Sequence, residues 1–231
     1  MDFRGLQKTT LLDYPGIIAA TVFTAGCNFR CPFCHNGDLV LAANSLPRIE
    51  ETEVLSFLQK RKGILKGLCI SGGEPTLQKG LPEFIQKVKD LGYLVKLDTN
   101  GSNPEMLKDL LENDLLSYVA MDIKNSPDSY EKTTDATGFS MEAISKSIEL
   151  LRQAGIPCEF RTTLVKELHT EADIRAIAHW FPKEIPYYLQ CYEENEQVIK
   201  PGFHPPTKEA MKRYQEILSE KLEQVYLRGV S

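Results

Sequence analysis

The stretch GLCISGGEPTLQKGLPEFIQKVKDLGYLVKLD, residues 67–98, decides the fold class. It begins and ends with short apolar runs, Gly67–Ser71 and Leu94–Asp98, and each run favours a β-strand. Between them, apolar residues recur at helical spacing, at Leu81, Phe84, Ile85, Val88 and Leu91. A strand, a core-facing helix and a second strand form a βαβ unit, and strands joined in this way lie parallel.

The same alternation of apolar runs and amphipathic stretches extends over most of the chain. It predicts six strands, at Ile17–Thr24, Gly67–Ser71, Leu94–Asp98, Tyr118–Ile123, Cys158–Val165 and Tyr187–Cys191. Six βα units fall short of the eight that close a barrel, so we expect an α/β fold with a partial (β/α)6 barrel. A doubly wound parallel sheet is the alternative.

The sequence shows no linker, internal repeat or low-complexity segment across its 231 residues. We therefore expect one domain over residues 1–231, with its core at about residues 17–192. A final helix from about Thr207 to Glu223 and a short strand at Val225–Leu227 are expected to complete it, over about residues 207–228.

Composition excludes several classes of function. Lys and Arg number 27 against 32 Asp and Glu, and the formal net charge of -5 gives no general attraction to nucleic acid or anionic lipid. No apolar run approaches the ~20 residues that span a bilayer. The first ten residues carry Asp2, Arg4 and Lys8 instead of a secretory apolar stretch. We expect a cytoplasmic protein with neither a nucleic-acid nor a membrane partner.

Three of the six cysteines lie in the segment GCNFRCPFCHN, residues 26–36, which we call the cysteine loop. The loop follows the first predicted strand, at the end where parallel α/β folds place their sites. In a reducing compartment, Cys27, Cys31 and Cys34 are expected to be metal ligands or catalytic thiols. A CxxxCxxC loop can wrap an iron-sulfur cubane and leaves one iron open for another molecule.

Other chemistries fit part of this loop. Three cysteines with His35 form a ligand set that zinc accepts, although adjacent ligands at 34 and 35 are awkward. Cys31 to His35 also matches the c-type haem pattern CxxCH, and Cys31 and Cys34 alone match a redox dithiol. Those two interpretations leave Cys27 without a role. A zinc or electron-transfer module is therefore the non-enzyme alternative.

The cysteine spacing, with Phe33 before the last cysteine, resembles the radical S-adenosylmethionine superfamily. Ser71-Gly72-Gly73-Glu74-Pro75 is similar to the GGEP segment of that superfamily. Further segments resemble the glycyl-radical-enzyme activases, above all those of anaerobic (class III) ribonucleoside-triphosphate reductases: Gln7-Lys8, Asp13–Gly16, Cys34–Asn36, Leu97–Gly101, Met121–Lys124 and Phe160–Thr163. The resemblance covers about residues 5–192, with a weaker match at 228–230.

This resemblance implies an oxidoreductase with a 4Fe-4S cluster on Cys27, Cys31 and Cys34. S-adenosylmethionine would chelate the open iron, and one electron from the cluster would cleave it to methionine and a 5′-deoxyadenosyl radical. The radical would take hydrogen from a glycine of a class III ribonucleotide reductase, with a flavodoxin or ferredoxin as electron donor. The resemblance also allows an activase of pyruvate formate-lyase or another glycyl radical enzyme, or a small-molecule enzyme such as 7-carboxy-7-deazaguanine synthase.

The resemblance also implies roles for individual residues. Contacts with S-adenosylmethionine are implied for Phe33, Asn36, Gly72, Gly73, Glu74, Asp98, Lys124 and Arg161. By this resemblance, Phe33 and Asn36 would border the adenine, Gly72 to Glu74 would meet the methionyl ammonium, and Lys124 and Arg161 would meet the carboxylate and ribose. A monovalent cation site is implied at Asp98, Thr99 and Asp122.

Without the resemblance, the residues also allow roles that involve no cofactor. These are a solvated Glu74 in a plain turn, loop packing for Phe33, and a salt-bridge network among the charged residues at the strand ends. Such charges need partners because unpaired burial is costly. The scattered Cys69, Cys158 and Cys191 are expected to act as small apolar fillers.

Overall fold

The structure is a computed structural model that describes residues 1–136 and 138–230. Within those residues one sheet contains eight strands, which follow each other in chain order. They are β1 (Phe3–Thr10), β2 (Ala19–Thr24), β3 (Gly67–Gly72), β4 (Leu94–Thr99), β5 (Tyr118–Asp122), β6 (Cys158–Leu164), β7 (Tyr187–Cys191) and β8 (Val225–Arg228).

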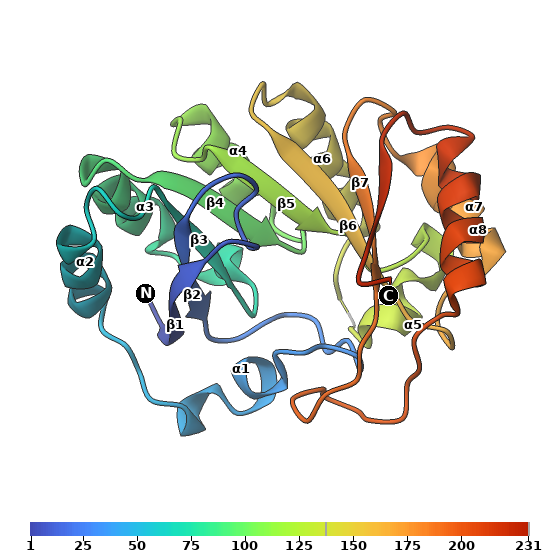
Figure 1. The fold of residues 1–231 in the computed structure, drawn as a ribbon, viewed down its shortest axis with the longest axis horizontal. Coiled ribbons are helices and arrows are strands. Elements are labelled where there is room, and N and C mark those ends of the chain that lie inside the picture. The colour runs from blue at the N-terminus through green and yellow to red at the C-terminus, as the bar shows by residue number, and fades with distance from the viewer. Residues whose placement is uncertain (137, 231) are drawn as a thin grey trace.

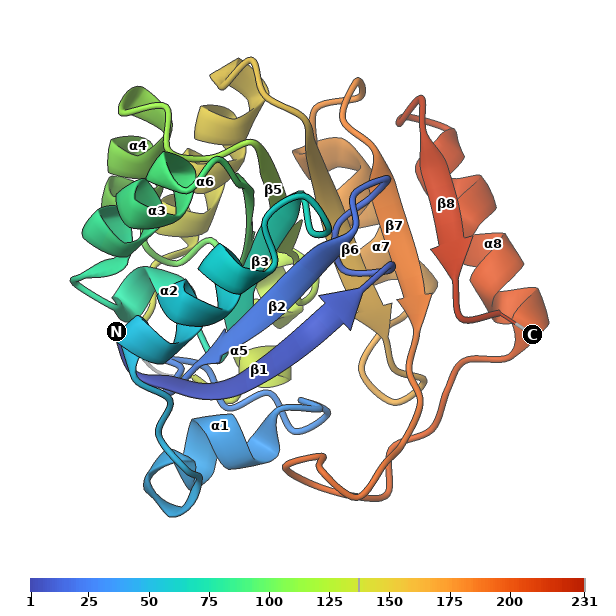
Figure 2. The ribbon, with the colours of Figure 1, turned by 60° about the vertical axis from the view of Figure 1, so that its left-hand side comes forward.

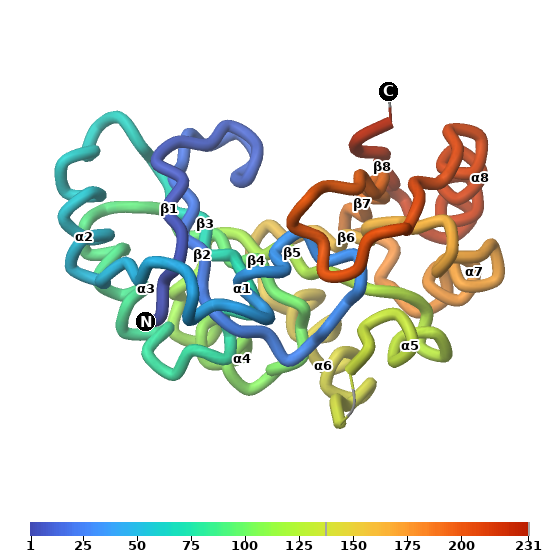
Figure 3. Tube along the Cα trace, turned by 90° about the horizontal axis from the view of Figure 1, so that it is seen from below, coloured from blue at the N-terminus to red at the C-terminus, as the bar shows by residue number. Residues whose placement is uncertain are grey.

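Strands β2 to β8 are all parallel, and β1 runs antiparallel to β2 along one edge (Figure 2). The strand order never reverses, which excludes the doubly wound alternative because that fold has a switch point in its order. Seen from below in Figure 3, the sheet curves with its helices outside, and β1 and β8 form its two separate edges. The predicted α/β partial barrel is confirmed.

All six predicted strands are present, with ends that differ by at most two residues; the first begins at Ala19 instead of Ile17. The predicted number of six strands is nevertheless wrong for the sheet. β1 precedes the six predicted strands, and β8 follows them as a further parallel strand. The sequence FRGLQKTT of β1 lacks an apolar alternation, and only Phe3 and Thr10 are buried in it. An edge strand of this kind is held mainly through its backbone pairing with β2.

Helices cover the outer face of the sheet, where their apolar stripes pack against it (Figures 1 and 3). In α3 the buried residues Leu81, Phe84, Ile85 and Val88 belong to the predicted stripe. The helices are α1 (Gly37–Leu41), α2 (Glu51–Lys60), α3 (Leu81–Asp90), α4 (Pro104–Glu112), α5 (Tyr130–Thr134), α6 (Met141–Gln153), α7 (Glu171–Trp180) and α8 (Lys208–Ser219).

Helix α8 is shorter than the predicted 207–223, because the chain turns after Ser219 and the backbone N–H of Glu223 donates to Lys183 O at 2.9 Å. No helix in the described part of the chain is both long and apolar enough to span a membrane.

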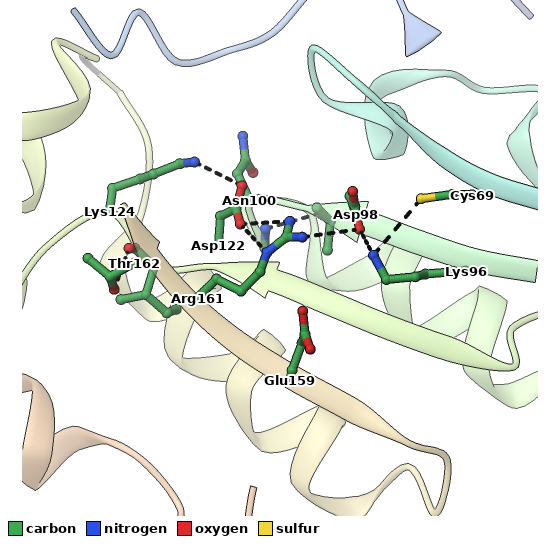
Figure 4. Close-up of polar contacts among 12 residues, drawn as sticks. Cys69, Lys96, Asp98, Asn100, Asp122, Lys124, Glu159, Arg161 and Thr162 are labelled. Carbon is green, nitrogen blue, oxygen red and sulfur yellow. Dashed lines mark hydrogen bonds and ion pairs between the residues drawn. The ribbon is translucent and has the colours of Figure 1, made fainter. Parts of the chain in front are cut away.

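Side chains on the strands alternate between the helix-covered face and the interior of the partial barrel. On β4, Val95 and Leu97 are fully buried in the hydrophobic core, whereas Lys96 and Asp98 lie on the inner face. Arg161 of β6 lies on the same inner face (Figure 4). The interior of the barrel is therefore charged, and it lies directly beneath the loops at the carboxyl ends of the strands.

Candidate active site

The cysteine loop connects β2 to α1 at the carboxyl end of the sheet. Cys27, Cys31 and Cys34 line one cavity, together with Gly72–Glu74 at the end of β3 and charged residues that include Lys124. We call this cavity the site cavity. It brings together segments that lie nearly 100 residues apart in the sequence, as expected where the ends of parallel strands converge.

The three thiols of the loop fit an iron-sulfur cluster better than a single zinc ion. They are free of disulfides, and among residues 1–136 and 138–230 no three His, Cys, Asp or Glu side chains are grouped closely enough for one metal ion. In a cubane each thiolate binds a different iron, so wider spacing is suitable. His35, the fourth ligand of the zinc alternative, has its Nε2 2.6 Å from Glu193 O and stacks on Tyr192.

Burial controls the protonation state of these thiols. It raises the pKa of Cys27 to about 11 and that of Cys31 to about 12, because a thiolate is poorly solvated there. Both side chains are therefore protonated at neutral pH in the metal-free protein. Binding iron requires them to release protons, so metal binding is coupled to pH.

Several backbone hydrogen bonds fasten the cysteine loop to distant segments. The N–H of Arg30 donates to Thr134 O at the end of α5, at 2.9 Å. From the segment after β7, the N–H of Lys200 donates to Pro32 O at 2.8 Å, and Gln197 O accepts at 3.1 Å from the N–H of Gly37, the residue that follows the loop and begins α1. Sequence reasoning missed these contacts because nothing in the spacing of residues 192–200 points to the loop.

Gly72 and Gly73 allow close approach, but the segment that approaches them is residues 24–26 of the same chain. Gly72 has a φ of +120°, and a Cβ there would lie 2.3 Å from Thr24 N. A Cβ on Gly73 would lie 1.9 Å from Gly26 O. The N–H of Gly73 donates to Thr24 O at 2.9 Å, so these glycines hold the entry to the cysteine loop in place.

Glu74 is buried, with 1% of its surface exposed, so the interpretation as a solvated side chain is wrong. Its Oε1 accepts from Thr76 N–H at 3.1 Å, Thr76 Oγ1 at 2.6 Å and Thr99 Oγ1 at 2.7 Å, and Oε2 accepts from Asn100 N–H at 2.7 Å. Burial raises the pKa of Glu74, and these donors oppose that effect. Three of the four donors share Oε1 and one contacts Oε2, so Oε2 is the carboxylate oxygen that retains a further acceptor position.

Asn36 and Asn100 also organise the rim of the site cavity. Asn36 Nδ2 donates to Gly72 O at 2.9 Å. Asn100, which sequence reasoning did not single out, donates from Nδ2 to Asn28 Oδ1 at 3.0 Å and to Cys27 Sγ at 3.8 Å. Phe33 lines the cavity but is 4% exposed and packs edge-on against Tyr192, which agrees with the loop-packing alternative.

The four charged residues predicted at the strand ends do come together, as a salt-bridge network on the inner face of the barrel (Figure 4). Arg161 Nε donates to Asp122 Oδ1 at 2.8 Å, and its Nη1 lies 3.7 Å from Asp98 Oδ1. Lys124 Nζ lies 3.1 Å from Asp122 Oδ2. The network also contains Lys96, which pairs with Asp98 and was not predicted.

Replacing Asp122 with asparagine tests this network through pH. Burial alone would raise the pKa of Asp122, but Arg161 and Lys124 outweigh it and hold the pKa at about 2, below its ordinary 3.8. The charged carboxylate therefore stabilises the fold above about pH 4, and this contribution is lost as the pH falls through about 2. In urea unfolding, the stability difference between wild type and Asp122→Asn should shrink from about pH 4 to pH 2. A difference that stays constant over that range contradicts the pairing.

Comparisons with known proteins agree with this geometry. Residues 21–181 match the family model described as the Radical SAM superfamily. A candidate glycyl-radical enzyme activating enzyme of Methanocaldococcus jannaschii is 35% identical over 194 residues, which cover 82% of this chain and 79% of that protein. The pyruvate formate-lyase-activating enzyme of Clostridium pasteurianum is 28% identical over 185 residues, or 76% of this chain and 74% of that protein.

A solved structure shows the same fold. The crystal structure of a domain of the pyruvate-formate lyase-activating enzyme from Bacteroides vulgatus aligns with a TM-score of 0.57 and 20% identity, over 71% of this chain and 99% of that chain.

The superfamily's enzymes use a 4Fe-4S cluster and S-adenosylmethionine, which supply reductive cleavage of the sulfonium and a radical that takes hydrogen. The family model matches more than half of the chain. The chain therefore belongs to the radical SAM superfamily of oxidoreductases and, within it, to the glycyl-radical enzyme activating enzymes.

Proposed function

We propose that this enzyme activates an anaerobic (class III) ribonucleoside-triphosphate reductase by generating a radical on one of its glycines. The main support is the site cavity, in which the cysteine loop, the Gly72–Glu74 segment and the charged network meet. The segments that resemble the reductase activases, such as Leu97–Gly101 and Met121–Lys124, favour this target. The sheet ends in separate edges at β1 and β8, which suits a flexible partner segment that enters from the side.

In this proposal the residues that line the site cavity, and Arg161, which contacts two of them, have distinct tasks. Cys27, Cys31 and Cys34 hold three irons and leave the fourth for the amino and carboxylate groups of S-adenosylmethionine. Lys124 and Arg161 offer positive charge to its carboxylate and ribose, with Asp98 beside them. Contacts on the adenine and ammonium sides are proposed for Phe33, Asn36, Gly72, Gly73 and Glu74. The protein's own contribution is to orient the cofactors and exclude water.

We propose further that residues 1–231 act as one functional unit, because one sheet runs from β1 to β8. The proposed electron donor is a flavodoxin or ferredoxin in the cytoplasm. A second candidate function is activation of pyruvate formate-lyase, which the likeness to the Clostridium pasteurianum enzyme supports.

Electron paramagnetic resonance of the partner tests the proposal. After anaerobic incubation of the reconstituted enzyme with S-adenosylmethionine, a reductant and a class III reductase, we expect a glycyl radical near the reductase C-terminus. The signal should be absent without S-adenosylmethionine and absent when the target glycine is replaced by alanine. A radical that forms on formate-lyase but never on a reductase from the same cell would defeat the choice of target and leave the family assignment intact.

A further inference from the structure

Lys96 is a fully buried lysine on the inner face of β4, two residues before Asp98. Its ammonium group pairs with Asp98 Oδ1, lies 3.9 Å from Cys69 Sγ, and is 5.8 Å from the centroid of the Tyr118 ring (Figure 4). A lysine with 1% of its surface exposed is rare unless its charge is matched. Its side chain therefore has a specific electrostatic partner, and that partner is Asp98.

Asp98 depends on this lysine. In residues 1–136 and 138–230, Lys96 is the group that donates a hydrogen bond to the Asp98 carboxylate. Arg161 also faces Asp98, but at 3.7 Å it lies beyond hydrogen-bond distance, and its close contacts are with Asp122 at 2.8 Å. A mostly buried carboxylate requires a cationic partner because it has lost most of its water. Lys96 meets that requirement from within the chain.

The other two residues of the expected cation site do not offer free side-chain oxygens to the same ion. The Thr99 hydroxyl donates to Glu74 Oε1 at 2.7 Å, and its oxygen already accepts from Gly101 N–H at 3.1 Å. Asp122 is already neutralised by Arg161 and Lys124. The side chains present therefore do not fit the monovalent cation that the resemblance implies at Asp98, Thr99 and Asp122.

The charge balance leads to the same result. Lys96, Lys124 and Arg161 supply three positive charges against the two negative charges of Asp98 and Asp122, so the network already holds one positive charge in excess. The neighbouring pair of Arg228 and Glu159 is balanced in itself, at 3.0 Å. A monovalent cation would add a second uncompensated positive charge, which the positive charges already present would repel.

We propose that the ammonium group of Lys96 is a built-in substitute for this monovalent cation, and that it fixes Asp98 beside the cofactor without an ion from solution. Lys96 is then a positioning residue that acts through Asp98. This role rests on the proposed function, because it assumes that Asp98 lies at bound S-adenosylmethionine. The pairing itself can be tested on the cofactor-free protein.

The first experiment measures thermal unfolding of the cofactor-free protein in KCl, NaCl and tetramethylammonium chloride at equal ionic strength. The wild-type midpoint should be the same in all three salts. Lys96→Met keeps an unbranched side chain of similar length and removes the charge, so it should lower the midpoint. K⁺ or Na⁺ should partly restore the midpoint of this variant, whereas the bulky tetramethylammonium should not. Lys108→Met removes the charge of an exposed lysine paired with Glu112, and should behave like wild type in every salt.

Two further variants keep the test decisive if Lys96→Met does not fold. Lys96→Arg retains the positive charge and should show no dependence on the cation. The double variant Lys96→Met/Asp98→Asn removes both charges and should fold, again with no dependence on the cation. A wild-type midpoint that rises specifically with K⁺ or Na⁺, a folded Lys96→Met that ignores them, or a double variant that fails to fold would each overturn the proposal.

Calorimetry with the reconstituted protein then measures affinity for S-adenosylmethionine. Wild type should bind equally well in the three salts, whereas Lys96→Met should bind about tenfold more weakly in tetramethylammonium chloride and recover in KCl. Equal affinity of both proteins in every salt would remove Lys96 from the cofactor site. If wild type fails to bind S-adenosylmethionine at all, the proposed function fails, and the unfolding data still decide whether Lys96 replaces a cation.

Discussion

Replacing Cys31 with alanine is expected to abolish the 4Fe-4S cluster and, with it, all cleavage of S-adenosylmethionine. Two thiolates cannot hold three corners of a cubane, and no other cysteine lines the site cavity in the described part of the chain. Cys27→Ala and Cys34→Ala should give the same result for the same reason. Iron and sulfide analysis, visible absorption and an anaerobic cleavage assay measure the loss, which should reach background.

The matched control replaces Cys69, Cys158 and Cys191 together with serine. These residues lie on β3, β6 and β7, outside the site cavity, so the folded triple variant should keep its full cluster. Loss of the cluster from that variant would require a fourth ligand or a second cluster. Full iron content and activity in any of the three loop variants would refute the ligand assignment.

Glu74→Ala should reduce the free energy of unfolding of the cofactor-free protein by about 3–5 kcal/mol, because the substitution leaves the buried donors of Thr76, Thr99 and Asn100 without their acceptor. The end of β4 would then lose its attachment to the segment that supports the cysteine loop. Glu74→Gln keeps one acceptor oxygen but turns an NH₂ group toward a donor, so we expect an intermediate loss. Urea unfolding measures both variants.

Glu105→Ala provides the control for this experiment, because it removes an exposed glutamate of α4 whose partner, Lys146, is also exposed. Its effect on stability should be negligible beside that of Glu74→Ala, because solvent screens an exposed ion pair. If Glu74→Ala instead left stability unchanged and only weakened the binding of S-adenosylmethionine, Glu74 would be a direct cofactor ligand and its hydrogen bonds to β4 would be incidental.

Most of the fold was predictable because buried parallel strands are rich in apolar residues, and β2 to β7 each carry an apolar run or, in β4 and β6, apolar residues that alternate with inward-facing polar ones. The exception is β1. Its residues Gln7 to Thr9 are exposed, and its place in the sheet depends on backbone pairing with β2, which leaves no mark on the side-chain pattern. β8 was predicted as a strand because its apolar residues follow a helix, but spacing alone could not show its parallel partner, β7.

The sequence predicted the parts of the site that lie in motifs. It did not predict the parts that depend on long-range contacts. The cysteines, the glycines and the charged strand ends were visible in the sequence. Lys96 was read as part of an apolar run, although its alternation with Val95 and Leu97 already indicated an inward-facing charge. The bidentate pair of Arg228 and Glu159 joins strands 69 residues apart, and no local pattern could connect them.

The fastening of the cysteine loop by Gln197 and Lys200 has a consequence for the order of events during synthesis. The three thiols leave the ribosome before these two anchors, because Gln197 lies 163 residues after Cys34. Until residues 197–200 are made, the cysteine loop lacks these hydrogen bonds. Iron would then encounter thiols that do not yet have their final spacing. We therefore expect the loop to hold a stable cluster only after residues 197–200 have been synthesised and have bound to it.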